Sequence, residues 1–296
     1  MTLPIPCGRI GEPMIDPEVL RRVVRTALDE DLGAGDITSE AVVPKGRRAR
    51  GVIVAREPLV VAGIEVAREV FRQVDPALAF HASIVDGADR VRGDTLASVE
   101  GEARSILAGE RTALNFLQRM CGIATMARAL VRRCAGAQVE IADTRKTAPG
   151  LRALDKWAVR SGGGTSHRAG LYDGVLIKDN HWRLVGGVGE AVRRARAALQ
   201  AAGPPRRPIE VEVGTAEEAE EALRAGADAL LLDNMDDSTL IRAVALASGR
   251  AFLEVSGGVS EESIPRLAAL GVNRISIGSL THSVRAADLA LETEGV

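Results

Sequence analysis

Apolar and polar positions in the first third of the chain follow two different periods. Over residues 15–31 apolar side chains recur every three or four positions, which is typical of an amphipathic helix, and Gly33 and Gly35 follow as helix-ending residues. A second helical pattern covers residues 66–74. Four short β-rich runs surround it, at residues 51–55, 59–62, 80–85 and 95–103. This order predicts a small α/β sandwich.

A long helical pattern then runs from about residue 105 to residue 134. Its apolar positions stay in register throughout, and Gly122 is its one weak point. We expect this helix to link two domains.

From residue 137 onward the pattern changes to repeated strand, loop and helix units. Strands are predicted at residues 139–142, 175–178, 209–213, 229–233, 251–255 and 274–277. Helical patterns between them cover residues 151–160, 189–201, 216–225, 238–247 and 261–270. Such alternation implies right-handed crossovers and a parallel sheet. Six units are too few to close an eight-stranded barrel, so we predict an incomplete or irregular (β/α) barrel, with a flat doubly wound sheet as the alternative.

The chain is therefore expected to be an α/β protein of two domains. An N-terminal α/β sandwich domain is assigned to residues 1–114 and the (β/α) barrel domain to residues 115–296. A C-terminal helix is expected to pack back on the N-terminal domain.

Composition narrows the possible partners and the compartment. Hydrophobic residues make up 46% and charged residues 26% of the chain, the ordinary mix of a folded protein. The net charge is −2 and aromatic residues are only 2%, so no surface for nucleic acid is expected. Cys7, Cys121 and Cys134 lack CxxC spacing, which favours a reducing compartment. With no signal segment or membrane-spanning run in the pattern, we expect a cytoplasmic protein that does not bind membranes.

Polar side chains follow every strand of the predicted barrel. Catalytic groups in such folds collect at the carboxyl ends of parallel strands. Five basic residues fall around the first two strand ends: Arg145, Lys146, His167, Arg168 and Lys178. Gathered in one pocket they would repel one another, so they predict a ligand that carries several negative charges. Surface ion pairs with Asp143 or Asp179 are the alternative.

Two carboxylates, Glu212 and Asp233, end the next two strands. Paired carboxylates among cations suit Mg²⁺ carried on a substrate phosphate, or ribose hydroxyls, and a general acid and base pair is a further possibility. Glu210 shares the face of Glu212 but sits deeper, so we expect it to pair with a cation inside the barrel.

Glycine-rich segments close the candidate site. Ser256-Gly257-Gly258 and Gly278-Ser279 follow the last two strands, where barrels often bind a phosphate through backbone N–H groups. Neither a dinucleotide fingerprint nor a P-loop is present in the sequence, so neither a nicotinamide cofactor nor ATP is favoured.

Five segments resemble the quinolinate phosphoribosyltransferase family, and the resemblance runs nearly from end to end. They are residues 27–38 (ALDEDLGAGDIT), 109–125 (GERTALNFLQRMCGIAT), 143–152 (DTRKTAPGLR), 162–181 (GGGTSHRAGLYDGVLIKDNH) and 231–235 (LLDNM). The resemblance implies a pentosyltransferase that converts quinolinate and phosphoribosyl pyrophosphate to nicotinate mononucleotide, pyrophosphate and CO₂ in NAD synthesis. It implies Mg²⁺ with phosphoribosyl pyrophosphate and no organic cofactor.

The resemblance also implies roles for individual residues. Thr144, Arg145, His167, Arg168 and Lys178 would bind substrate, with the two quinolinate carboxylates held by the basic residues among them. Arg111 would enter from a second subunit, which implies at least a homodimer. Lys146 would face the pyrophosphate, Glu212 and Asp233 the ribose and its metal, and Ser256, Gly257 and Gly278 the 5′-phosphate. Lys146, Lys178, Glu212 and Asp233 are thus the expected catalytic residues.

Three other functions compete with this interpretation. A related pyrophosphorylase of metal-cofactor metabolism shares the DTRKT and GGG-HR patterns, but the segment KDNH at residues 178–181 favours the quinolinate enzyme. A Schiff-base lyase would use Lys178 as nucleophile. A non-catalytic anion-binding protein would gain nothing from Glu212 and Asp233.

Overall fold

The computed structural model describes residues 15–134, 136–203, 207–247 and 249–295. The described chain forms two compact units. The sandwich unit comprises residues 15–128, 146–163 and 279–295, and the barrel unit lies within residues 129–145 and 164–278. The predicted boundary between residues 114 and 115 stays a prediction. No helix in these described ranges is long and apolar enough to cross a membrane.

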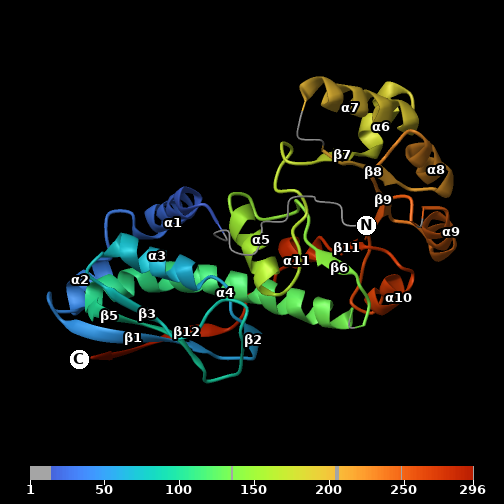
Figure 1. Cartoon of the computed structure of the whole chain (residues 1–296). Helices are drawn as coiled ribbons and strands as arrows, with labels where there is room; N and C mark the ends of the chain where they lie inside the picture. Colours follow the sequence, from blue (N-terminus) through green and yellow to red (C-terminus); the bar gives the residue numbers. More distant parts are fainter. Residues whose placement is uncertain (1–14, 135, 204–206, 248, 296) are drawn as a thin grey trace. The chain divides into compact units, whose positions relative to one another are not determined.

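The sandwich unit is built on an antiparallel sheet (Figure 1). Its strand order is β12-β1-β5-β3, and the bounds are β1 Arg48–Ala55, β3 Ala79–Ala82, β5 Thr95–Glu102 and β12 Leu289–Gly295. A separate pair joins β2 (Leu59–Val60) to β4 (Asp89–Arg90).

The C-terminal segment corrects one expectation, because it is a strand and not a helix. Strand β12 pairs antiparallel with β1, from Leu289 opposite Ala55 to Gly295 opposite Ala49. Leu289 and Leu291 lie two positions apart, so they fall on the same face of the strand. The hydrogen-bonding edge of β1 supplies its partner.

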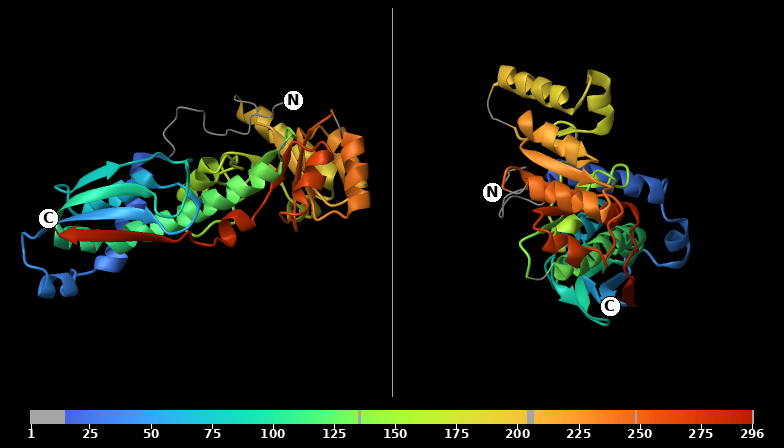
Figure 2. Two further views of the ribbon diagram at one scale, coloured as in Figure 1. Left: turned by 90° about the horizontal axis from the view of Figure 1, so that it is seen from below. Right: turned by 90° about the vertical axis from the view of Figure 1, so that its right-hand side faces the viewer.

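Helices cover one face of this sheet (Figures 1 and 2). They are α3 Ile64–Val74 and the first part of α4 Ala103–Arg133, with α1 Pro17–Leu32 against α3. Phe71, Ile53, Leu96, Ile106 and Leu117 are fully buried and form the core of this layer. The shorter helices of the unit are α2 Ile37–Val42, α5 Arg152–Ser161 and α11 Ser279–His282.

Gly122 in α4 permits a close crossing of two chain segments. A Cβ at this position would lie 3.3 Å from the Cα of Ala286 and closer still to the carbonyl oxygen of Arg285. The N–H of Ala287 donates to the carbonyl of Gln118 over 2.9 Å, which fixes the crossing. The helix therefore tolerates a poor helix former because the segment leading to β12 needs the space.

The barrel unit contains a wholly parallel sheet with the strand order β6-β11-β10-β9-β8-β7. Its bounds are β6 Glu140–Ala142, β7 Val175–Ile177, β8 Ile209–Val213, β9 Ala229–Asp233, β10 Phe252–Ser256 and β11 Arg274–Ser276. Each strand from β7 to β11 lies beside the next, and β6 lies beside β11. This is the cyclic order of a barrel left open between β6 and β7. It confirms the predicted incomplete barrel and excludes the doubly wound alternative, whose first strand would lie inside the sheet.

Helices of the barrel unit lie on one side of the sheet, as Figures 1 and 2 show. They are α6 Asp179–Val185, α7 Val188–Ala202, α8 Ala216–Arg224, α9 Asp237–Ala247 and α10 Ile264–Ala269. The other side of the sheet is the inner face of the open barrel. Cys121 and Cys134 are buried free thiols, and Cys7 lies outside the described residues.

Candidate active site

Strand register gathers the polar side chains of the barrel on its inner face. Partner residues of neighbouring parallel strands point to the same side of a sheet, as do residues two apart in one strand. Glu212 pairs with Leu231, Leu231 with Glu254, and Glu254 with Arg274. Asp233 therefore shares this face with Glu212, and Ser256, its own partner, shares it too. The carboxylates predicted at two successive strand ends are thus neighbours on one surface.

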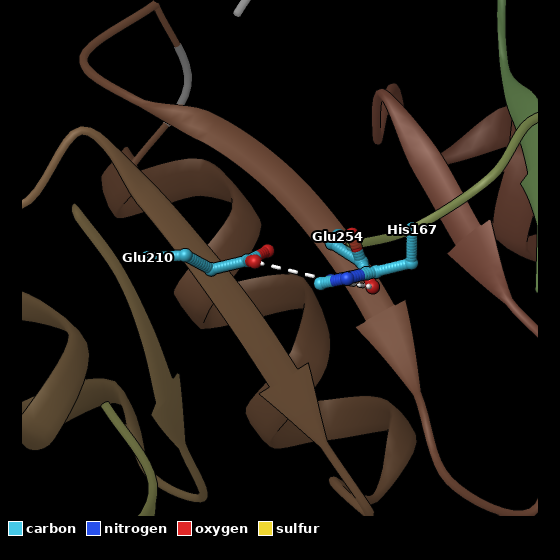
Figure 3. Close-up of side chains that lie close together, drawn as sticks. All are labelled: His167, Glu210 and Glu254. Carbon is cyan, nitrogen blue, oxygen red and sulfur yellow. Dashed lines mark ion pairs between the residues drawn. The ribbon is translucent and has the colours of Figure 1, made fainter. Parts of the chain in front are cut away.

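A buried cluster lies deeper on the same face. The Nε2 atom of His167 is 3.2 Å from a carboxylate oxygen of Glu210 and 3.4 Å from one of Glu254. Figure 3 shows the three side chains converging in front of the sheet, with the helices behind it. They are 7%, 3% and 0% exposed, respectively. Glu210 was predicted to pair with a cation inside the barrel, and its partner there is His167, which is a cation only when its ring is protonated.

The cluster continues into a network that the sequence interpretation missed. Glu254 accepts a 2.5 Å hydrogen bond from Ser276 and lies 3.3 Å from the Arg274 guanidinium. Arg274 also donates two hydrogen bonds, of 2.9 and 2.7 Å, to Glu140. Charged side chains at alternate positions of otherwise apolar strands were the available signal, because a buried charge requires a partner.

Three ligand atoms of this cluster, from His167, Glu210 and Glu254, lie within 4.8 Å of one another, a spacing that could hold a metal ion. The guanidinium of Arg274 already contacts Glu254, however, and a cation beside another cation is repelled. The contacts favour an internal ion-pair network at this position.

Burial and neighbouring charges set the protonation of the cluster. Burial raises the pKa of Glu254 to about 7, and the negative charge of Glu210 acts in the same direction. His167 and Arg274 oppose this rise. Burial lowers the pKa of His167, but the charges of Glu254 and Glu210 outweigh it, so the net change is upward.

The loop that carries His167 and Arg168 is held by main-chain hydrogen bonds. The N–H of His167 donates to the buried carboxylate of Asp143 over 2.9 Å. The N–H of Arg168 donates to Nδ1 of His167 over 2.7 Å. The Arg168 guanidinium donates to the carbonyl of Gly174 over 3.1 Å. These contacts fix the loop after α5 against the end of β6.

Two of the predicted cations lie close enough to affect each other. Burial lowers the pKa of Arg168, and the nearby charge of Arg145 lowers it further. Arg168 is 7% exposed. Two guanidinium groups so arranged form a region that an anion would stabilise, as predicted for this pocket.

Lys178 lies at the carboxyl end of β7, where α6 begins. Its Nζ forms an ion pair with Glu212, and its backbone N–H donates to Nδ1 of His181 over 2.9 Å. The Lys178 and Glu212 side chains are 43% and 14% exposed, so the pair lies at the rim. An ammonium held by a carboxylate suits an electrostatic role better than that of a Schiff-base nucleophile.

Two tight turns, one after β9 and one after β10, contact each other. Asn234 has a positive φ of 52°, and its N–H donates to the carbonyl of Ser256 over 3.1 Å. Its side-chain amide donates to Asp233 over 2.7 Å. Gly257 follows with φ of 89°, a conformation that favours glycine. This turn presents the predicted phosphate-binding residues Ser256 and Gly257, and Gly278 follows β11.

Two predicted site residues belong to the sandwich unit. Arg111 is exposed on α4, and Lys146 is exposed just after the barrel segment that ends at Arg145. The carbonyl of Lys146 accepts a 2.8 Å hydrogen bond from Thr281. Their roles stay predictions, and Thr144, half-buried beside Arg145, likewise keeps a predicted role.

The chain is similar to known proteins over almost its whole length. Family models for the quinolinate phosphoribosyl transferase C-terminal and N-terminal domains match residues 123–292 and 36–121. A probable nicotinate-nucleotide pyrophosphorylase (carboxylating) of Bacillus subtilis is 41% identical over 92% of this chain and 93% of its own length. A nicotinate-nucleotide pyrophosphorylase (carboxylating) of Mycobacterium leprae is 42% identical over 93% of this chain and 97% of its own.

Solved structures agree with the sequence relatives. The nicotinate-nucleotide pyrophosphorylase from Francisella tularensis superimposes with a TM-score of 0.89 at 36% identity, covering 95% of this chain and 98% of that one. Both domain models, the relatives and the fold point the same way, and the chain belongs to the quinolinate phosphoribosyltransferase family.

Proposed function

We propose that this protein transfers the phosphoribosyl group of phosphoribosyl pyrophosphate to quinolinate, with release of pyrophosphate and CO₂ and formation of nicotinate mononucleotide for NAD synthesis. The observation that carries the proposal is the near-complete match to relatives named for this carboxylating pyrophosphorylase activity. The inner face supports it independently, because cations and carboxylates stand side by side there.

Arg145 and Arg168 are the proposed clamp for the two carboxylates of quinolinate, with His167 and Lys178 beside them. Arginine matches a carboxylate through two parallel hydrogen bonds, so a pair of arginines can hold both groups of one small ring. Such a clamp would align the pyridine nitrogen with C1 of the sugar. It would also exclude neutral pyridines, which leave the arginine charges unbalanced.

The chemistry that follows needs no organic cofactor. The ring nitrogen forms a bond to C1 as the bond from C1 to the pyrophosphate oxygen breaks. The ring then carries a positive charge, so it can accept the electron pair left when the bond to the adjacent carboxylate breaks as CO₂ departs. A proton completes the ring carbon. Lys146 is the proposed partner of the departing pyrophosphate.

Glu212 and Asp233 fit a magnesium ion in donor type and position. Both offer carboxylate oxygens, the ligands that Mg²⁺ prefers, from one face at the carboxyl ends of β8 and β9. Bound with the pyrophosphate, Mg²⁺ would neutralise the negative charge of the leaving group. Glu212 also forms an ion pair with Lys178, so binding of the metal ion would have to redistribute this contact.

Ser256, Gly257 and Gly278 are proposed to bind the 5′-phosphate. Glycine lets backbone N–H groups approach an anion, and Gly257 has the positive φ that favours this residue. Arg111 is proposed to act across a homodimer interface, where a second subunit would complete the site.

A cytoplasmic location is inferred from the free thiols Cys121 and Cys134.

The test is a coupled assay for CO₂ and nicotinate mononucleotide from quinolinate, phosphoribosyl pyrophosphate and Mg²⁺. Nicotinate replaces quinolinate in the control, and Arg145→Ala is assayed in parallel. Turnover of quinolinate but not nicotinate, lost in the variant, is the expected result. A folded wild-type protein without turnover would overturn the proposal and point to the related pyrophosphorylase of metal-cofactor metabolism.

A further inference from the structure

We propose that Glu254 is a positioning residue for quinolinate binding: together with Glu210 it fixes the His167 ring, and that ring fixes the main chain at Arg168. The inference rests on the proposed function, since Arg168 is the proposed clamp for a substrate carboxylate. Glu254 is fully buried and reaches the substrate only through His167.

Both nitrogens of the His167 ring have close polar neighbours, an ion pair on one side and a hydrogen bond on the other. Nε2 faces carboxylate oxygens of Glu210 and Glu254 at 3.2 and 3.4 Å, and an acceptor on that side requires a proton on Nε2. Nδ1 accepts the N–H of Arg168 over 2.7 Å, which opposes a proton there. The contacts therefore define the tautomer of the neutral ring, with the proton on Nε2.

Glu254 is well suited to hold this ring because it is itself immobilised. One oxygen accepts from Ser276 over 2.5 Å, and the other lies 3.3 Å from Arg274. Arg274 is fixed in turn by two hydrogen bonds to Glu140 and by the face of Phe252, 5.0 Å from its guanidinium carbon. The acceptor for His167 is thus held by contacts from three adjacent strands.

Arg168 needs such support because its position is electrostatically unfavourable. Arg168 is 7% exposed and lies near the charge of Arg145. Like charges separate unless the chain holds them in place. The hydrogen bond from the Arg168 N–H to His167 and the one from the His167 N–H to Asp143 provide that restraint.

Glu254→Gln tests the role with minimal change in shape. The amide oxygen can still accept from Ser276. Above pH 7, where Glu254 is mostly ionised, the uncharged amide replaces a charged neighbour of His167. We expect the KM for quinolinate to rise about ten- to a hundredfold, the loss typical of a hydrogen bond to a charged group. The kcat and the KM for phosphoribosyl pyrophosphate should change by less than about threefold. Glu57→Gln, which removes the charge of a carboxylate paired with Arg285 in the sandwich unit, is the control and should leave the KM for quinolinate within about threefold of wild type.

A purely structural role predicts a different pattern. Loss of folded protein lowers kcat and leaves both KM values unchanged, and that result for Glu254→Gln would overturn the proposal. If the variant does not fold, nitrogen NMR of ¹⁵N-histidine-labelled wild-type protein decides, with the His167 signal assigned by its absence in His167→Asn. The neutral ring is observed at a pH above the raised pKa of His167; there, a proton on Nε2 and an acceptor Nδ1 support the proposal, and a proton on Nδ1 overturns it. Failure of the proposed function would appear separately, as wild-type protein without turnover of quinolinate.

Discussion

Adding a single methyl group at Gly257 should impair the binding of phosphoribosyl pyrophosphate. Gly257 has φ of 89°, and a Cβ there would lie 2.5 Å from Cγ and 2.8 Å from the backbone N of Asn234. Real Cβ atoms do not approach other atoms so closely, and the backbone cannot move aside like the end of a side chain. Asn234 is itself held, because its N–H donates to the carbonyl of Ser256.

The magnitude follows from two terms. A side chain in the left-handed region costs about 1–2 kcal/mol, and an overpacked contact costs about 1–3 kcal/mol. If the turn relieves this strain by moving, the phosphate site loses its geometry. Since about 1.4 kcal/mol corresponds to tenfold in affinity, Gly257→Ala should raise the KM for phosphoribosyl pyrophosphate at least about tenfold.

Gly258→Ala supplies the matched control. Gly258 has φ of 58°, so alanine there is also strained, but its Cβ would meet no atom within 4 Å. We expect its KM to stay within about threefold of wild type in initial-velocity assays with quinolinate saturating. Equal KM values for the two variants, or a wild-type KM in Gly257→Ala, would refute the assignment of this turn to the 5′-phosphate.

Three further predictions concern stability. Gly122→Ala should lower the melting temperature. The clash of the new Cβ with the carbonyl of Arg285 costs about 1–3 kcal/mol, which exceeds the gain in helix propensity of about 1 kcal/mol. An unchanged melting temperature would contradict the observed crossing. Asp155→Ala should lower the free energy of unfolding, measured in urea titrations, by about 3–5 kcal/mol. The substitution leaves the partly buried Arg119 without the carboxylate to which it donates two 2.8 Å hydrogen bonds. A loss below about 1 kcal/mol would contradict this stabilising role of the ion pair. Burial raises the pKa of Glu254 from 4.5 to about 7. The favourable contribution of this carboxyl to the free energy of unfolding is therefore complete below pH 4.5 and is lost as pH rises through about 7. The free energy of unfolding of Glu254→Gln should therefore improve relative to wild type over this range, and a pH-independent difference would show that this carboxyl does not titrate as described.

Much of the site could be predicted because its residues follow strands directly. Glu212 and Asp233 were expected to be neighbours, since consecutive strands of a parallel barrel end at one edge, and the register places them on one face. Glu210 was expected to pair inside the barrel because the side-chain period of a strand is two. Local pattern was sufficient in these cases.

The buried network could not be predicted in the same way. The charged residues of this network come from distant parts of the chain. Glu140 precedes both Glu254 and Arg274 by more than a hundred residues, and in the sequence each of the three is an isolated charge. Only the strand order, with β6 beside β11 and β11 beside β10, brings them together. The contact between His167 and Glu254 could not be predicted for the same reason.

The sequence by itself determined the α/β class, the parallel barrel with its polar strand ends and the family, because these depend on periodicity and on local motifs. Only the tertiary structure decided that the C-terminal segment is a strand on β1, that Gly122 makes room for that segment, and that Glu254 and Glu210 share His167. These features are contacts between distant segments. They depend on which edges, charges and surfaces the fold brings within reach of one another, and no local pattern specifies that.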